Sequence, residues 1–398
     1  MTVAHRILRP MTGFDTVGLT RPASQLVTIF GGSGFLGRHV VRSLAKQGYR
    51  IRVAVRRPDL AQFLQPLGRV GQIVGVQANL RNPESIRRAA EHADIVVNLV
   101  GILQEGGNQS FQRLQAEGAG EVARAAAAIG APLVHVSAIG ADADSPAAYA
   151  RTKAEGEAQV FAARPDAIVF RPSIVFGPGD GFFNRFAGLA RLMPVLPIAG
   201  AATRMQPVFV GDVAEAITRA VEGRARAGTV YELGGPEIRT LQELIDYTLA
   251  VTMRHRVVLP LPQPLAMLQA RVLELADTLT LGLLPDGVKL TRDQVLMLQS
   301  DNVVSEAAKA EGRTIEALGI TPTAVEAVVP GYLWRFRKAG QFATRRGTPE
   351  MATIPDLIAP EPMGQGSAHH PHDAGGPAVG QKGAGAGDAP GMRWGRRY

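Results

Sequence analysis

The sequence contains no cysteine in its 398 residues. This absence excludes a disulfide framework, a zinc site built on thiolates and a cysteine nucleophile. No apolar run reaches the roughly 18 residues that a transmembrane helix requires, so none is predicted. Zinc-finger spacing and basic stretches interleaved with aromatic residues are also missing, and we therefore expect no binding to nucleic acid.

The sequence does contain enough apolar residues for a folded core, together with an excess of positive charge. Hydrophobic residues make up 46% of the chain, which excludes a wholly disordered protein. The formal net charge is +8, and residues 1–57 carry ten Lys or Arg against a single acid, Asp15. A basic N-terminal portion favours an anionic ligand, an acidic partner or an anionic lipid surface.

From Leu26 onward, short apolar runs alternate with helical stretches. Six runs predict strands that are apolar on both faces, over residues 26–30, 51–55, 73–76, 95–100, 133–136 and 168–170. Helical patterns fill the gaps over residues 35–47, 83–92, 111–129 and 147–162. This repetition predicts an α/β fold with a doubly wound parallel sheet.

Composition and rhythm divide the chain into four parts. We predict an N-terminal arm over 1–24, a dinucleotide-binding domain over 25–176, a smaller mixed lobe over 177–345 and a flexible tail over 346–398. Asp15 interrupts an otherwise acid-poor segment, which favours a plain arm over a mitochondrial transit peptide. The tail is rich in Gly, Pro, Ala and His and has little to bury.

The smaller lobe has a looser pattern, with helices predicted over 212–222 and 241–253 and a strand over 229–233. Three prolines between residues 260 and 264 predict a linker, and Thr291 with Gln294 has the spacing of a capping box. Large apolar side chains recur at helical spacing at Leu268, Val272, Leu275 and Leu279. Such a stripe favours a place in the core, and an interface with a partner or a membrane is the alternative.

A glycine-rich loop joins the first strand to the first helix. It reads Gly31, Gly32, Ser33, Gly34, Phe35, Leu36, Gly37 and satisfies Gly-x-Gly-x-x-Gly. Glycine permits the tight turn and the close approach of a pyrophosphate, while the helix N-terminus supplies free N–H groups. At the start of a strand–helix–strand series, this loop predicts a dinucleotide site rather than a plain glycine turn.

The end of the second strand indicates which dinucleotide is bound. NAD sites usually place a carboxylate there for the ribose 2′-hydroxyl, whereas this strand ends in Arg56 and Arg57. A guanidinium binds a 2′-phosphate that a carboxylate would repel. We therefore predict NADP(H) over NAD(H), with Asp59 outside the site.

Ser137, Tyr149 and Lys153 have the pattern of a catalytic set. Tyr149 and Lys153 are four residues apart in a helical stretch and share one face, while Ser137 follows the fifth strand. A neighbouring ammonium and an oxidised nicotinamide favour the phenolate, which would make Tyr149 an acid or base near neutrality. The alternative is that these residues grip a permanently bound nucleotide without turnover.

Together these motifs resemble the short-chain dehydrogenase/reductase superfamily in its extended or atypical branch. The resemblance implies a Rossmann fold in which segments after the third, fourth and sixth strands also contact the cofactor. In this sequence those segments supply Asn79, Leu80, Leu99, Val100, Gly101, Pro172 and Ile174. Relatives often have Asp at the position of Asn79, so this chain departs from the pattern there.

A closer resemblance covers roughly residues 26–340, and it is to the family of Rossmann-fold accessory subunits of respiratory complex I. Besides the nucleotide motifs, it includes Met-Gln-Pro-Val-Phe-Val-Gly-Asp-Val over 205–213, the proline-rich 259–264 and Leu-Thr-Arg-Asp-Gln-Val over 290–295. The family implies tightly held NADPH and a structural role in assembly. Its members brace the junction of the peripheral and membrane arms.

We therefore expect an NADPH-binding accessory subunit that is not the site of electron transfer. The alternative is a free NADP-dependent reductase, epimerase or dehydratase acting on a small sugar or an isoprenoid-like substrate. High Ala, Arg and Gly content favours a bacterial source and a peripheral position on the cytoplasmic face of the inner membrane. A mitochondrial matrix position is the alternative.

Other signals are given plainer interpretations. His369, His370 and His372 lie in the predicted tail without supporting ligands, so we predict no metal site. His135 lies within an apolar strand and is interpreted as a hydrogen-bonded core histidine. A cationic stripe on the first helix, at Arg38, Arg42 and Lys46, favours a solvated face over a dock for an acidic partner.

Overall fold

The computed structural model describes residues 22–280 and 289–340, apart from 108 and 339. The predicted tail over 346–398, with His369, His370 and His372, lies outside these residues, and so does the predicted arm except for 22–24. Within the described ranges, no helix combines the length and the apolar character needed to cross a bilayer.

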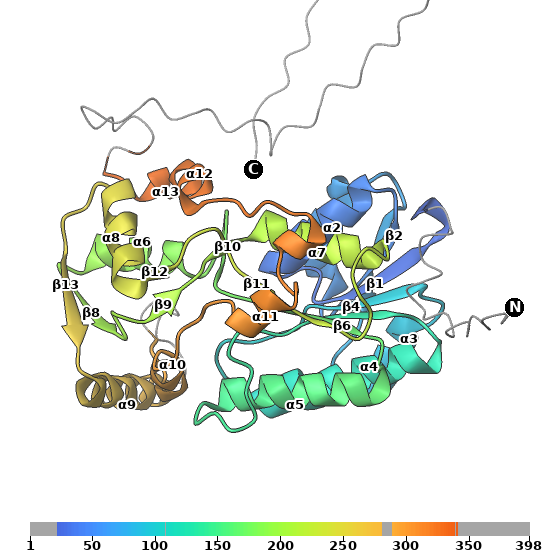
Figure 1. Ribbon diagram of the computed structural model, residues 1–398, viewed down its shortest axis with the longest axis horizontal. Helices are drawn as coiled ribbons and strands as arrows, with labels where there is room; N and C mark the ends of the chain where they lie inside the picture. The colour runs from blue at the N-terminus through green and yellow to red at the C-terminus, as the bar shows by residue number, and fades with distance from the viewer. Residues whose placement is uncertain (1–21, 108, 281–288, 339, 341–398) are drawn as a thin grey trace, which may run out of the picture. The chain divides into compact units, whose positions relative to one another are not determined.

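A parallel sheet of seven strands confirms the predicted fold class (Figure 1). Its strands are β1 (Leu26–Phe30), β2 (Arg50–Val55), β3 (Ile73–Gln77), β4 (Ile95–Asn98), β5 (Leu133–Val136), β6 (Ile168–Pro172) and β11 (Val230–Leu233). They lie in the order β11-β6-β5-β4-β1-β2-β3. The order reverses between β1 and β4, which makes this the switch point of a doubly wound sheet.

Helices cover both faces of the sheet, as Figure 1 shows. One face packs against α2 (Phe35–Lys46) and α7 (Val210–Val221), the other against α3 (Pro83–Ala90), α4 (Gly118–Ala128) and α5 (Ala148–Ala163). Successive strand residues enter opposite cores, so Ile29 joins the α2 side and Phe30 the α4 side. Because both faces are covered, the strands are apolar on both faces.

The remaining elements form a smaller mixed region built on three two-stranded pairs. The pairs are β7 (Val175–Phe176) with β10 (Val208–Phe209), β9 (Arg204–Met205) with β12 (Arg239–Thr240), and β8 (Val195–Ala199) with β13 (Val257–Leu261). The helices are α6 (Phe183–Leu192), α8 (Leu241–Val251), α9 (Gln263–Leu279), α10 (Arg292–Met297), α11 (Glu306–Ala310), α12 (Val325–Val328) and α13 (Pro330–Leu333). Phe176, Phe183 and Leu244 are fully buried at the centre of this region.

The predicted linker around residues 260–264 is wrong, because these residues end a strand and begin a helix. Pro260 lies in β13, opposite Ile198 of β8, and Pro264 lies in the first turn of α9. In the described structure β13 pairs only with β8, so a proline there costs no second ladder of hydrogen bonds. A proline in the first turn of a helix removes only an N–H that has no partner inside the helix.

Two further predictions for this region need correction. The stripe on α9 faces outward instead of joining the core, since Leu268 is 56% exposed and Leu279 is 74% exposed. The capping box at α10 is half formed: Thr291 Oγ1 accepts a hydrogen bond from Gln294 N at 3.2 Å. The Gln294 side chain instead donates to the backbone carbonyl of Leu103 at 3.5 Å.

Candidate nucleotide-binding site

The glycine loop between β1 and α2 is packed so tightly at Gly31 and Gly37 that these positions exclude a side chain. Gly31 adopts φ +80°, a left-handed conformation that favours glycine. A Cβ on Gly37 would lie 2.4 Å from the carbonyl oxygen of Gly31, which no side chain tolerates. The sequence therefore fixes a turn in which the helix begins directly against the end of the strand.

The N-terminus of α2 is suited to an anion. Its N-cap residue is Gly34, no side chain caps it, and the first turn contains no acid. Free N–H groups and the positive end of the helix dipole favour a phosphate at such a terminus. Arg38 adds an exposed cation nearby, with Nε 3.5 Å from the carbonyl oxygen of Gly34.

The segment after β4 lies directly against the glycine loop. Leu99 N donates to Phe30 O at 3.0 Å, and Val100 N donates to Asn98 Oδ1 at 3.2 Å. A Cβ on Gly31 would lie 3.1 Å from Val100 Cγ2. The structure thus brings two of the predicted cofactor segments together at the switch point of the sheet.

The two arginines after β2 have different surroundings. Both are exposed, but Arg57 Nη2 forms an ion pair with Asp59 at 3.0 Å. This hydrogen bond holds the pKa of the Asp59 carboxyl below its usual value. Among the described residues Arg56 meets no carboxylate, so it is the guanidinium available at this strand end.

Asn79 and Leu80 follow β3, and their contacts mainly stabilise the turn that leads into α3. Asn79 Oδ1 accepts from Arg81 N at 3.1 Å, and Asn79 N donates to Ser85 Oγ at 2.9 Å. Leu80 is buried and packs against Gly118. These contacts fix the entry to α3, and contact of Asn79 with an adenine stays a prediction.

Lys153 reaches from α5 to the carboxyl ends of β4 and β5. Its Nζ donates to Val136 O at 3.3 Å and lies 3.3 Å from the point that a Cβ on Gly101 would occupy. Burial lowers the pKa of Lys153 to about 8, although the charge of Glu157 opposes this shift. The ammonium is therefore poised to lose its proton just above neutrality.

Ser137 follows Val136 at the end of β5. Its backbone N donates to Phe170 O at 2.7 Å, which fixes the residue between two strands. Its Oγ is buried and has no hydrogen-bond partner in the described part of the chain. A buried hydroxyl without a partner is costly, so this oxygen is a natural contact for a bound molecule.

Tyr149 stands one turn before Lys153 on α5, with its ring edge-on to Phe111 at 5.7 Å. Burial, and next the charge of Asp293, raise the pKa of Tyr149 to about 12. The predicted preference for the phenolate is therefore absent from the protein alone. Loss of hydration and the nearby carboxylate both disfavour the charged phenolate, and together they outweigh the effect expected from the Lys153 ammonium.

Asp293 lies in the segment 290–295, and no role was predicted for it. Its carboxylate accepts from Ala148 N at 2.5 Å and from Tyr149 N at 3.1 Å, so α10 caps the helix that carries Tyr149 and Lys153. A separation of 144 residues gave no local signal for this contact.

His135 is buried as predicted, but only one ring nitrogen is hydrogen-bonded. The amide of Asn98 donates to its Nδ1 at 3.2 Å, while its buried Nε2 meets no partner among the described residues. Burial, and next the charge of Lys153, lower the pKa of His135 to about 3. The ring is therefore neutral, with its proton on Nε2.

The end of β6 is held by the segment that follows β5, and the residues after β6 are held by β10 of the smaller region. Pro172 O accepts from Ile139 N at 3.0 Å, and Ile174 O accepts from Val208 N at 2.9 Å. Beside it, Arg171 forms two hydrogen bonds with the buried Glu157 of α5, at 2.9 and 2.6 Å. This ion pair fastens α5 to β6 and was not anticipated from the sequence.

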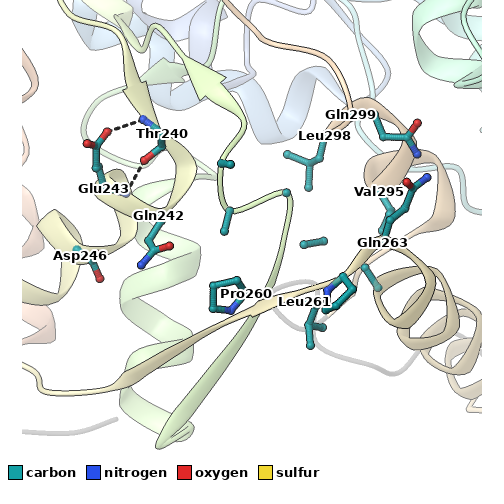
Figure 2. Close-up of a pocket in the computed structure, with 16 residues that line it drawn as sticks. Thr240, Gln242, Glu243, Asp246, Pro260, Leu261, Gln263, Val295, Leu298 and Gln299 are labelled. Carbon is teal, nitrogen blue, oxygen red and sulfur yellow. Dashed lines mark hydrogen bonds between the residues drawn. The ribbon is translucent and has the colours of Figure 1, made fainter.

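A separate cavity of about 740 Å³ lies in the smaller region, between α8, β13 and α10 (Figure 2). Gln242 and Asp246 lie on one side, Val295 and Leu298 on another, and Pro260 beneath them. None of the predicted nucleotide or catalytic residues lines it. The helix α10 thus borders this cavity while Asp293 holds α5.

Comparisons with known proteins agree with this geometry. Residues 27–234 match the model of the NAD dependent epimerase/dehydratase family. The chain is 31% identical over 330 residues to NADH dehydrogenase (ubiquinone) 1 alpha subcomplex subunit 9, mitochondrial, of Arabidopsis thaliana, covering 82% of this chain and 81% of that protein.

Two further similarities are partial or structural. The chain is 36% identical over 192 residues to ceramide reductase of Caulobacter vibrioides, covering 48% of this chain and 59% of that protein. The NADPH-dependent quinone oxidoreductase QOR2 of Escherichia coli, in complex with NADPH, superposes with a TM-score of 0.57 at 20% identity, over 75% of this chain and 96% of that one. The latter similarity supports the fold alone.

Proposed function

The chain belongs to the NAD dependent epimerase/dehydratase family, and we propose that it is an NADPH-binding accessory subunit of respiratory complex I. The observation that carries the proposal is the extent of the similarity to the Arabidopsis subunit. It covers 82% of this chain and so extends well past residue 234, where the family match ends. A dinucleotide fold shared by many enzymes would not by itself favour this subgroup.

The proposed nucleotide lies across the switch point of the sheet. The N-terminus of α2 would hold the pyrophosphate, and Arg56 would neutralise the 2′-phosphate that distinguishes NADPH. Lys153 would hold the nicotinamide ribose, and Ser137 would offer its unpartnered hydroxyl at the nicotinamide end. When bound, the nicotinamide supplies a hydride donor or acceptor.

The proposed role is structural. The subunit would brace the junction of the peripheral and membrane arms and take part in assembly, without passing electrons itself. Its position would be peripheral on the inner membrane, on the cytoplasmic face in a bacterium or the matrix side in a mitochondrion. The nucleotide then acts as part of the fold, because a ligand that binds only the native state stabilises it.

Native purification tests this proposal directly. NADH:quinone oxidoreductase would be isolated from membranes of the source organism under mild detergent, and its chains and extracted nucleotides identified by mass spectrometry. We expect this chain at one copy per complex, with NADPH recovered in matching amount. A pure, active complex without the chain would refute membership, and recovery of NADH alone would refute the cofactor assignment.

A second candidate function is a free NADP-dependent reductase. Two observations favour it: the similarity to ceramide reductase, and the position of Lys153 at the end of β5 next to Ser137, with Tyr149 one turn away on the same helix. In this reaction Tyr149 would donate a proton to a carbonyl oxygen as the hydride arrives, with Ser137 holding that oxygen.

A single-turnover experiment separates the two candidates. The purified chain, loaded with NADPH, would be mixed with candidate ketones, and the loss of nicotinamide absorbance followed. A reductase oxidises its NADPH in a burst that Tyr149→Phe abolishes while nucleotide affinity is unchanged. An accessory subunit shows no burst in either form.

A further inference from the structure

Helix α9 buries small side chains and exposes large apolar ones, which is the reverse of an ordinary surface helix. Its small residues Ala266 and Ala270 are buried against the protein, while large apolar side chains point outward. The exposed fractions are 53% for Leu265, 56% for Leu268, 58% for Val272, 61% for Leu275 and 74% for Leu279. Spaced by three and four residues in turn, these five form one continuous outer seam.

The acids of α9 form ion pairs with residues at or just before the start of α10, and each keeps 31% of its side chain exposed. Glu274 pairs with Arg292 at 2.7 Å, and Asp277 pairs with Lys289 at 3.3 Å. Arg271 is exposed and is the helix's one basic residue. The outer seam thus carries no negative charge, although positions that face water usually carry charged side chains.

The strand pair that precedes α9 carries further exposed apolar side chains. On one side of the β8–β13 pair, Val195 and Val257 stand opposite each other and are 39% and 61% exposed. Leu259, two residues along β13 on the same side, is 48% exposed, and Leu192 just before β8 is 80% exposed. We call this set, with the α9 seam, the apolar face.

Three arginines adjoin the apolar face at its β13 end. Arg191 precedes Leu192, and Arg256 precedes Val257, with Arg254 beside them. Among the residues described, none of these guanidinium groups pairs with a carboxylate; Arg254 and Arg256 instead donate to the backbone oxygens of Phe336 and Ala190. Burial, and next the charges of Arg256 and Arg191, lower the pKa of Arg254, so the three repel one another.

We propose that the apolar face docks onto an anionic membrane surface, with Arg191, Arg254 and Arg256 contacting lipid headgroups. Apolar side chains set beside cations are the combination that partitions into an acyl–headgroup boundary. A second copy of the chain fits less well, because 17 residues give fewer than the three to four heptads that indicate a coiled coil. It would also leave the arginines without counter-charge. The inference requires only this chain and lipid, so it is independent of complex I membership.

Sedimentation with vesicles tests the proposal. The purified full chain would be mixed with vesicles of phosphatidylcholine alone or of an equal mixture with phosphatidylglycerol. We expect binding to the mixed vesicles that weakens as salt rises and is much weaker on phosphatidylcholine. The double change Leu268→Glu, Leu275→Glu should reduce partitioning by about tenfold or more, because two charged groups replace side chains that enter the bilayer.

Matched variants separate this surface from general stickiness. Val70→Glu alters a fully exposed apolar side chain outside the apolar face and should bind as the unchanged protein does. Arg191→Gln should weaken binding to the anionic vesicles only. Circular dichroism and retained nucleotide affinity would establish that each variant is folded.

The opposing outcomes are distinct. Absence of binding to both vesicles, or equal binding by the α9 double variant, would overturn the proposal. If the unchanged chain does not bind vesicles and the double variant fails to enter the native complex, the apolar face belongs to a protein partner. This result would also overturn the proposal. Vesicle binding by a chain that is missing from purified complex I would refute only the proposed function.

Discussion

Replacing Asp293 tests how the smaller region fixes the helix that carries Tyr149 and Lys153. The N-cap residue of α5 is Ala147, which has no side chain to cap the helix. Asp293 supplies the missing acceptors through its bonds to Ala148 N and Tyr149 N. Asn keeps the size and one acceptor oxygen but loses the charge, whereas Ala loses both.

The expected magnitudes follow from the two contributions. Removal of a capping side chain costs about 0.5–2 kcal/mol. The charge of a carboxylate at a helix N-terminus contributes about 0.3–1 kcal/mol of this stabilisation. Because Asp293 is half-buried, we expect values in the upper part of both ranges. Asp293→Asn should therefore cost about 1 kcal/mol, and Asp293→Ala about 2 kcal/mol.

The same change should lower the pKa of Tyr149, since the carboxylate is the second cause of its rise to about 12. A raised tyrosine pKa means that the folded state keeps its proton while the unfolded state, near pKa 10, loses it. Stability from this group is full below about pH 10 and falls as the pH rises toward 12. Asp293→Asn should shift the upper end of this window downward.

Two measurements check the prediction. Urea unfolding gives the free-energy change, and alkaline ultraviolet titration gives the tyrosinate signal, assigned to Tyr149 by difference from Tyr149→Phe. A structural loss alone would lower stability and leave the titration of Tyr149 unmoved. The reasoning is refuted if Asp293→Asn leaves both the urea midpoint and the Tyr149 titration at their original values.

Three other predictions concern the same site. Gly37→Ala should lower the free energy of unfolding by about 1–3 kcal/mol through overpacking, and it should weaken NADPH binding measured by calorimetry. The control Gly188→Ala, in open space on α6, should raise the free energy of unfolding by about 0.5–1 kcal/mol. Glu157→Gln should cost about 1.5–3 kcal/mol in urea unfolding, because the Arg171 guanidinium loses its nearer carboxylate and keeps only Glu232, 3.9 Å away; an unchanged midpoint would contradict this. NADPH affinity should fall as the pH rises through about 8 and Lys153 loses its charge, a step absent from Lys153→Met. The lowered pKa of Lys153 also makes the free energy of unfolding rise between about pH 8 and 10.5, because in this range Lys153 carries its proton in the unfolded state only.

The strands of the main sheet could be predicted to within two residues because their signal is local. A strand covered on both faces is apolar throughout, and glycine or proline interrupts the chain between strands. The strand β13 was missed because Pro260 resembles a breaker. Only its pairing with a single neighbour makes that proline harmless, and pairing is not a local property.

In the site, too, local patterns could be predicted from the sequence and contacts between distant segments could not. Tyr149 and Lys153 are related by one helical turn, and Ser137 follows a recognisable strand, so their pattern was visible in the sequence. The roles of Asp293 and Glu157 depend on contacts between distant segments. The pKa of Tyr149 depends on burial as well, and burial reversed the sign of the shift that the residue types alone predicted.

Helix α9 shows what a periodic pattern leaves open. Apolar side chains at intervals of three and four define a face, but the period is identical whether that face points inward or outward. In this helix Glu274 and Asp277 pair with Arg292 and Lys289, which lie beyond the end of the helix in the sequence, while the leucines point outward. Among the described residues nothing covers this apolar seam, and the arginines at the β13 end of the apolar face, which meet no carboxylate there, favour an anionic partner.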